Sequence, residues 1–172
     1  MKVSAFNFFL YFCTMNTNFP QLNLPPIEAK VKKGSSGRLQ IYDPQRRIFV
    51  TLTAEEWVRQ HFVQYLINNL GYPAAVIGNE VGLAVGGVQR RSDTVVYSPT
   101  DGHPLLIIEY KAAHVSITQD VFMQIQSYNS VLRADYLVVS NGLHHYCCYN
   151  DYETMTPRFL PHIPRWAEIV KI

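Results

Sequence analysis

Two apolar strands joined by a tight turn dominate the middle of the chain, in the segment RRSDTVVYSPTDGHPLLIIEYK (residues 90–111). Residues 94–97 and 105–108 are β-branched and apolar, and the Ser-Pro-Thr-Asp-Gly sequence between them is dense in turn formers. We therefore predict an antiparallel hairpin whose bend is centred between Thr100 and Asp101.

The position of the bend predicts which residues face each other. Residues whose numbers add up to about 201 are expected to be opposite, so Asp93 lies opposite Ile108 and one step from Glu109. Because side chains alternate along a strand, Glu109 and Lys111 share one face. Ile108 and Tyr110 share the other face. Two carboxylates and one ammonium group are therefore expected to converge.

These three charges need compensation if they are buried. A buried carboxylate at the end of an apolar strand such as LLIIE is costly unless a partner or a metal ion compensates it. Mg²⁺ is suitable because it takes one or two carboxylates, keeps several waters and contacts substrate phosphate. The same ion makes hydroxide available and stabilises a pentacoordinate phosphorane. The spacing of Asp93, Glu109 and Lys111 alone leaves open an ordinary surface charge cluster.

Composition indicates a globular protein without a global charge signal. The 172 residues, 48% hydrophobic and 16% charged, suit one domain with a sizeable core. The net charge of +2 is slight, so a phosphate-binding surface has to be a local patch.

The cysteines, Cys13, Cys147 and Cys148, lack metal-ligand spacing and fit a reducing, cytoplasmic location. The adjacent histidines, His144 and His145, point to opposite faces of a strand, which argues against a shared metal.

The N-terminal segment is expected to lie outside the folded domain. Residues 1–14 contain the apolar run FNFFLYFC, but no small-x-small cleavage site follows it. The run is far short of the ~20 apolar residues of a membrane helix, so we expect no membrane association and a true start at Met15. Residues 16–37 are typical of a solvated, extended arm. We therefore expect an arm over residues 1–37 and a single domain over residues 38–172.

A helix is expected over residues 54–70. Thr53 is a good N-cap, and Gly71 ends the helix. Glu55 and Glu56 lie in the first turn, where the helix dipole favours negative charge. The phase of the apolar stripe places Glu55 on the flank of the buried face. A role limited to complementing the helix dipole explains the presence of Glu55 and Glu56 equally well.

The rest of the chain predicts further strands and a second long helix. The other expected strands cover residues 39–42, 48–52, 74–83, 135–140 and 144–149, and a short helix around Trp166 caps the domain. The second helix begins after Thr118 and ends at about Leu132. Gln124 and Tyr128 are four residues apart and share one of its faces.

The predicted elements follow one another as a helix, three strands, a second long helix and a further strand. In this order the chain resembles the PD-(D/E)xK nuclease superfamily, and more closely the nuclease domain at the N-terminus of type I restriction enzyme R subunits. The matching segments are EEWVRQ, RRSDTVVY, LLIIEYKA, QIQSY and VVSNG, which cover residues 53 to about 150. The resemblance implies an α/β (α+β) fold with a restriction-endonuclease-like three-layer core, in which helices flank a central mixed sheet. The single domain, residues 38–172, would then be nuclease-like.

The chain departs from this pattern in two ways. Ser92 precedes Asp93 where the superfamily is named for proline, a change that the superfamily tolerates. R subunits continue into a helicase motor, and the residues after 150 contain no phosphate-binding loop. We therefore expect the nuclease module alone.

The resemblance also implies roles for individual residues. Asp93 and Glu109, with the backbone carbonyl of Tyr110, would hold Mg²⁺, for which Mn²⁺ is a substitute. Lys111 would orient the attacking water or help to deprotonate it.

Further residues would support this site. Gln124 and Tyr128 match the Q-x-x-x-Y element of RecB-like members, which supports the site and contacts DNA near the scissile phosphate. Glu55 would be the supporting glutamate of the helix, ahead of Glu56 by phase, and Glu80 is a further candidate.

Two classes of function follow. The first is Mg²⁺-dependent DNA phosphodiester hydrolysis, of restriction or repair type, in which Arg90 and Arg91 meet a phosphate backbone unless they are simply solvated. The second is a nucleic-acid-binding or protein-interaction module that keeps the nuclease fold without turnover. The triad of Asp93, Glu109 and Lys111 favours the first, and the small net charge and missing motor favour the second.

The implied partners are DNA and other restriction or repair subunits, and a homodimer would supply two sites for double-strand cleavage.

Overall fold

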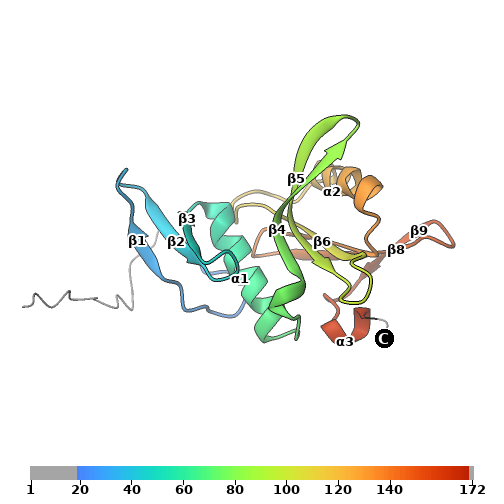
Figure 1. The fold of residues 1–172 in the computed structure, drawn as a ribbon, viewed down its shortest axis with the longest axis horizontal. Coiled ribbons are helices and arrows are strands. Elements are labelled where there is room, and N and C mark those ends of the chain that lie inside the picture. Colours follow the sequence, from blue (N-terminus) through green and yellow to red (C-terminus); the bar gives the residue numbers. More distant parts are fainter. Residues whose placement is uncertain (1–18, 171–172) are drawn as a thin grey trace, which may run out of the picture.

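A computed structural model describes residues 19–170 as two β-sheets and two long helices (Figure 1). The smaller sheet is antiparallel and has the order β1-β2-β3, with bounds β1 (Val31–Lys33), β2 (Leu39–Asp43) and β3 (Ile48–Thr51). The predicted β2–β3 hairpin is confirmed. The sequence predicted a solvated arm through residue 37, whereas Val31 pairs with Ile41 and Leu22 is buried in the core. The polar composition of this segment hid these contacts.

The larger sheet has six strands in the order β4-β5-β6-β7-β8-β9. Its strands are β4 (Ile77–Val85), β5 (Val88–Tyr97), β6 (Pro104–Tyr110), β7 (Tyr136–Ser140), β8 (His145–Asp151) and β9 (Thr156–Leu160). β6 and β7 are parallel, and helix α2 (Gln119–Leu132) connects them. Strand β9 was not predicted, because Pro157 argues against a central strand and is tolerated here only at the sheet edge.

Both long helices lie where the sequence predicts them. Helix α1 (Ala54–Asn68) begins after Thr53, whose hydroxyl accepts the N–H of Glu56 at 3.0 Å, and Gly71 follows its end with φ of 79°. A 3₁₀ turn, η1 (Ala74–Val76), leads into β4. The short helix α3 (Trp166–Ile169) confirms the predicted cap: the indole of Trp166 packs against Tyr72.

The two long helices cover opposite faces of the six-stranded sheet. Phe62 of α1 lies in one core cluster with Ile108 and Tyr110 of β6, whereas Ile125 of α2 lies in a second cluster with Ile107. The alternation of side chains along β6 therefore divides the core into two layers. This arrangement confirms the predicted fold class, a mixed sheet flanked by helices.

The adjacent cysteines follow the same alternation. Cys147 lies in the α1 cluster and Cys148 in the α2 cluster, and both are buried free thiols. Cys13 and the apolar run in residues 1–14 lie outside the described residues. None of the helices within residues 19–170 has the length and apolar character needed to cross a membrane.

The register of the central hairpin differs by one residue from the prediction. Thr94, not Asp93, pairs with Ile108, because the pairing shifts between Val96 and Tyr97. The irregularity sits next to the turn, where sequence alone does not reveal it. Asp93 therefore lies just beyond the last β5–β6 pair, beside Glu109.

Candidate active site

The Asp93 carboxylate lies where the pairing of β5 with β6 ends. Thr94 and Ile108 form the last pair, so the N–H of Tyr110 has no partner on the backbone of β5. It donates instead to Oδ2 of Asp93 at 2.8 Å. This bond holds the aspartate beside Glu109 at the end of two central strands. The predicted convergence of the two carboxylates is present.

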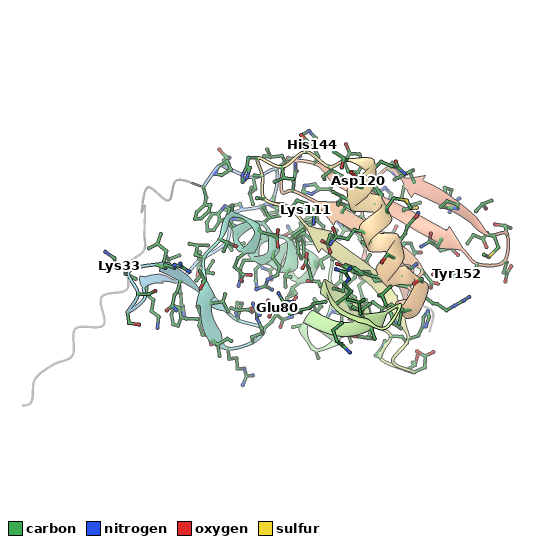
Figure 2. All side chains as sticks on the ribbon, turned by 90° about the horizontal axis from the view of Figure 1, so that it is seen from above. Lys33, Glu80, Lys111, Asp120, His144 and Tyr152 are labelled. Atoms are coloured by element: carbon green, nitrogen blue, oxygen red, sulfur yellow. The ribbon has the colours of Figure 1, made fainter. Side chains whose placement is uncertain are left out.

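A network of hydrogen bonds ties Glu109 to the neighbouring helix α2. The ammonium group of Lys111 and the amide of Gln124 both donate to Oε1 of Glu109, at 2.8 and 2.7 Å. The Gln124 amide also lies 2.8 Å from the hydroxyl of Tyr128. Seen from above, Lys111 lies between the two long helices (Figure 2). The structure therefore brings Lys111, from the end of β6, together with Gln124 and Tyr128, which the sequence places on one face of the second helix.

The second oxygen of Glu109 is buried and has no hydrogen-bond partner. The residue is 4% exposed. Burial, and next the negative charge of Asp93, raise the pKa of Glu109 to about 7. Burial also raises the pKa of Asp93. A cation between these carboxylates would relieve both effects, and Oε2 of Glu109 has no hydrogen bond that a cation would have to displace.

The donor set suits a hard divalent cation. Asp93, Glu109 and the backbone carbonyl of Tyr110 offer oxygen atoms, which Mg²⁺ and Mn²⁺ prefer. In the part of the chain that the structure describes, no three His, Cys, Asp or Glu side chains are grouped to hold a metal ion. Mg²⁺ needs only one or two carboxylates, because waters and substrate phosphate complete its shell. The residues present therefore fit Mg²⁺.

Lys111 is held as a cation. Burial alone would lower its pKa, but the hydrogen bond and the charge of Glu109 raise it above its ordinary value. Its side chain is 20% exposed, so it remains accessible to a ligand. A permanently charged ammonium group can stabilise negative charge but is a poor proton acceptor.

The three candidate supporting glutamates occupy different environments. Glu55 lies at the start of α1, and the surrounding protein and the charge of Asp93 raise its pKa while Lys111 opposes them. Glu55 is therefore coupled electrostatically to Asp93 and Lys111. Glu56 instead binds Arg59 at 2.5 and 2.8 Å. Glu80 pairs with Arg46 at 2.5 Å.

The two candidate DNA-binding arginines lie on the outer half of β5. Arg90 and Arg91 are exposed, and Nη1 of Arg91 is 3.4 Å from Oε1 of Glu80. Arg91 precedes Asp93 by two residues and therefore lies on the same side of the strand. Neither arginine contributes to the hydrogen bonds around Glu109.

The histidine pair follows the prediction that its side chains diverge. His144 is exposed, whereas the ring of His145 hydrogen-bonds Ser140 and packs against Phe62. His145 is thus a half-buried residue with a satisfied hydrogen bond.

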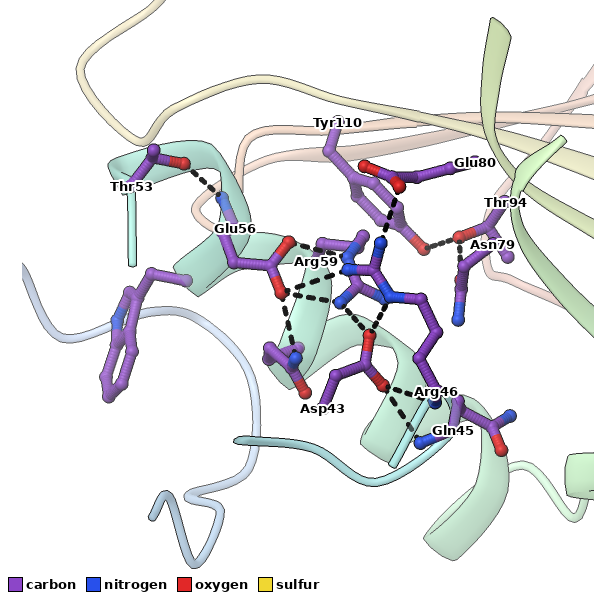
Figure 3. Close-up of polar contacts among 12 residues, drawn as sticks. Asp43, Gln45, Arg46, Thr53, Glu56, Arg59, Asn79, Glu80, Thr94 and Tyr110 are labelled. Carbon is purple, nitrogen blue, oxygen red and sulfur yellow. Dashed lines mark hydrogen bonds and ion pairs between the residues drawn. The ribbon is translucent and has the colours of Figure 1, made fainter. Parts of the chain in front are cut away.

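Sequence reasoning missed a buried ionic cluster beside the site (Figure 3). Nη2 of Arg59 lies 2.5 Å from Oδ2 of Asp43 and 2.5 Å from Oε1 of Glu56. Nε of Arg46 lies 2.6 Å from the same Asp43 oxygen. Asp43 looked like a turn residue because it precedes proline, and its partner Arg59 is 16 positions away. No local sequence signal connects them.

We expect the stability of the metal-free protein to fall as pH rises from 4.5 towards 7. The folded pKa of Glu109 is raised to about 7 from an ordinary 4.5, so the folded state holds a proton that the unfolded state has released. The stabilisation is complete below the pKa that Glu109 has in the unfolded chain. It is lost as pH rises through the pKa that Glu109 has in the folded protein. Denaturant unfolding across this range, in chelator, measures the slope. Glu109→Gln should have a flatter profile, and an unchanged profile would contradict the assignment.

A central mixed sheet between two helices, with two carboxylates and a lysine where its central strands end, defines a mixed α+β domain with a charged site at the sheet end. Residues 54–164 match the family described as type I restriction enzyme R protein N terminus (HSDR_N), and the chain belongs to this family.

The fold is also similar to that of a solved structure. It is a fragment of a protein described as an HsdR subunit of a type I restriction enzyme from Vibrio vulnificus YJ016, with a TM-score of 0.50 and 21% sequence identity. The match covers 69% of this chain and 24% of that one, so the chain spans about a quarter of its length. At this identity the likeness concerns the fold. No curated protein matches the chain.

Proposed function

We propose that the chain hydrolyses phosphodiester bonds in DNA as a PD-(D/E)xK nuclease module, with a divalent cation at Asp93 and Glu109. The observation that carries the proposal is the buried Oε2 of Glu109, which has no partner and lies beside a second carboxylate. Membership in a family of restriction enzyme subunits supports DNA as the substrate. Other restriction subunits are the expected protein partners.

The cation would be Mg²⁺ or Mn²⁺, held by Asp93, Glu109 and the carbonyl of Tyr110. When bound it supplies Lewis acidity and lowers the pKa of a water molecule. The chain itself fixes the ligands: the N–H of Tyr110 orients Asp93, and Gln124 orients Glu109. Such orientation removes the cost of rearranging ligands when the substrate binds.

The protonated Lys111 would stabilise the negative charge that develops on the phosphorane. Its raised pKa favours this role, with orientation of the attacking water, over proton abstraction. Gln124 and Tyr128 form the Q-x-x-x-Y element, and their hydrogen bond aligns the amide with Glu109. Glu55 is the proposed supporting carboxylate, because its charge contributes to the raised pKa of Glu109.

The β4–β5 hairpin is the expected path for the DNA backbone. It projects from the body of the molecule near α2 (Figure 1) and carries the exposed Arg90 and Arg91. Gly82 pairs with Arg91, and a side chain at Gly82 would meet nothing within 4 Å. Neither packing nor a positive φ therefore requires glycine at this position. Close approach of a ligand backbone is an ordinary reason for a strand glycine.

Gly82→Val is expected to weaken DNA binding by about tenfold, as expected for a lost contact worth ~1.4 kcal/mol. The fold should remain intact, because valine favours strands and the space is open. Fluorescence anisotropy with labelled duplex DNA measures the affinity. Thr156→Val, at an exposed position of β9, is the matched control. Equal affinity of both variants and the wild type would show that DNA does not pass over Gly82.

A binding module without turnover is the second candidate. It is favoured by the hydrogen bonds that Lys111 and Gln124 already make to Glu109, because they leave one Glu109 oxygen satisfied without a cation. A homodimer would provide two such surfaces. This candidate predicts salt-dependent DNA binding without cleavage.

Incubation with linear, circular and single-stranded DNA in Mg²⁺, Mn²⁺ or chelator separates the two candidates. The nuclease proposal predicts cleavage that requires the cation. Binding that weakens with salt, without cleavage in either metal, would support the second candidate. Cleavage that continues in chelator would contradict a metal-dependent reaction.

A further inference from the structure

We propose that Arg46 and Glu80 are positioning residues for Asp93: the turn between β2 and β3 holds a break in β4 directly across from this aspartate. The effect on catalysis rests on the proposed nuclease function. The effect on the geometry of Asp93 does not.

Strand β4 runs from Ile77 to Val85, but its pairing with β5 skips one position, at Glu80, and this unpaired position is the break. Asn79 pairs with Thr94 and Val81 pairs with Ser92, but the intervening residues, Glu80 and Asp93, do not pair. Glu80 has φ of 55°, a left-handed conformation that is unfavourable for a glutamate. The break therefore coincides with the candidate catalytic aspartate. Backbone strain of this kind persists only where surrounding contacts maintain it.

The break leaves Asp93 free of both neighbouring strands. On the β4 side its expected partner is Glu80, and on the β6 side pairing stops at Thr94. The Asp93 side chain can then turn to accept the N–H of Tyr110 at 2.8 Å. If β4 closed into a regular ladder at this point, Asp93 would be drawn into pairing with β4. The geometry of the carboxylate beside Glu109 would change with it.

Arg46 holds Glu80 in this conformation. Its Nη1 lies 2.5 Å from Oε2 of Glu80 (Figure 3). Arg91 approaches the other oxygen of Glu80 at 3.4 Å. Arg46 is itself fixed, because Asp43 accepts hydrogen bonds from its Nε at 2.6 Å and from its backbone N–H at 3.1 Å. The ion pair thus joins a rigid turn to the break.

The turn is anchored independently at two further points. Asp43 is 1% exposed and pairs with Arg59 of α1 at 2.5 Å. The side chain of Gln45 donates to the carbonyl of Ala74, just before β4, at 3.1 Å. These anchors connect the small sheet to both α1 and β4. The small sheet lies outside residues 54–164, the segment that matches the family.

A merely structural tie between the sheets would give a different mutational pattern. In that case any substitution that removes the Arg46–Glu80 pair would act alike, and glycine, which weakens strands, would be the worst choice. If the pair instead maintains the left-handed break, glycine at position 80 keeps the break without the pair, since it adopts positive φ readily. Alanine does not.

The experiment compares Glu80→Ala, Glu80→Gly and Arg46→Ala with the wild type. Arg47→Ala, which removes the same charge from the adjacent exposed residue, is the control. We expect Glu80→Ala and Arg46→Ala to lower kcat for DNA cleavage by about tenfold, the lower end of effects seen for positioning residues, with little change in KM. Glu80→Gly and Arg47→Ala should retain near wild-type kcat.

The amide resonance of Tyr110 provides a readout that does not depend on activity. Its N–H donates to Asp93, so its chemical shift should move in Glu80→Ala and Arg46→Ala and stay in place in Glu80→Gly. If Glu80→Gly is as impaired as Glu80→Ala, or if the Tyr110 resonance is the same in all variants, the inference is wrong. If the wild type cuts no DNA, the nuclease proposal fails, and the Tyr110 shifts still decide the inference.

Discussion

Asp93→Asn is expected to lower the rate of DNA cleavage by about 10²- to 10³-fold, the cost typical of removing one group that stabilises charge in a transition state. Asparagine keeps an oxygen that accepts the N–H of Tyr110, so the local backbone is preserved. It removes the negative charge that a cation between Asp93 and Glu109 requires. Loss of rate without loss of fold is therefore the specific expectation.

Single-turnover cleavage with Mg²⁺ measures the effect of Asp93→Asn, and thermal unfolding checks the fold. Glu153→Gln, which neutralises an exposed carboxylate in the β8–β9 turn, is the matched control and should cleave like the wild type. Lys111→Ala should also lower the rate, because it removes the cation next to Glu109. A wild-type rate in Asp93→Asn would reject this site.

Arg59→Met should lower the free energy of unfolding by about 3–5 kcal/mol, the usual cost of breaking a buried ion pair by removing one of its members. Arg59 bridges Asp43 and Glu56, and Asp43 is 1% exposed. Burial alone would raise the pKa of Asp43, but Arg59 and Arg46 lower it, so its carboxylate is charged at neutral pH. Methionine fills similar space, removes one of the two arginines that pair with Asp43 and takes the nearer arginine away from Glu56.

Urea unfolding at neutral pH measures the loss in Arg59→Met. Arg90→Met, at an exposed arginine, is the control and should change stability little. A loss below about 1 kcal/mol would show that the cluster is solvated.

Local signals in the sequence were sufficient for the main elements of the fold. The turn formers around Thr100 and Asp101 correctly placed the central hairpin, and capping and periodicity correctly placed α1 and α2. The register was wrong by one residue because the shift at Val96 depends on how the strand meets the turn. Strands β1 and β9 were not predicted, because the lysines of β1 and the proline of β9 are unfavourable for strands. The two strands form through their pairing with β2 and β8.

The candidate site was predictable where it depends on periodicity. The alternation of strand residues places Glu109 with Lys111, and the helical repeat places Gln124 with Tyr128. Partners distant in sequence were not predictable. The ion pair between Arg46 and Glu80 joins residues 34 positions apart, and nothing near either residue indicates the other.

Mn²⁺ titration by isothermal calorimetry tests the central claim most directly, with wild-type protein and Glu109→Gln compared in the presence and absence of DNA. We expect one ion per wild-type chain, bound at least about tenfold more weakly by Glu109→Gln. Binding should also weaken as pH falls below about 7, because protonation of Glu109 removes a ligand. Equal binding by both proteins, or no binding by the wild type with DNA present, would contradict a metal centre at Asp93 and Glu109.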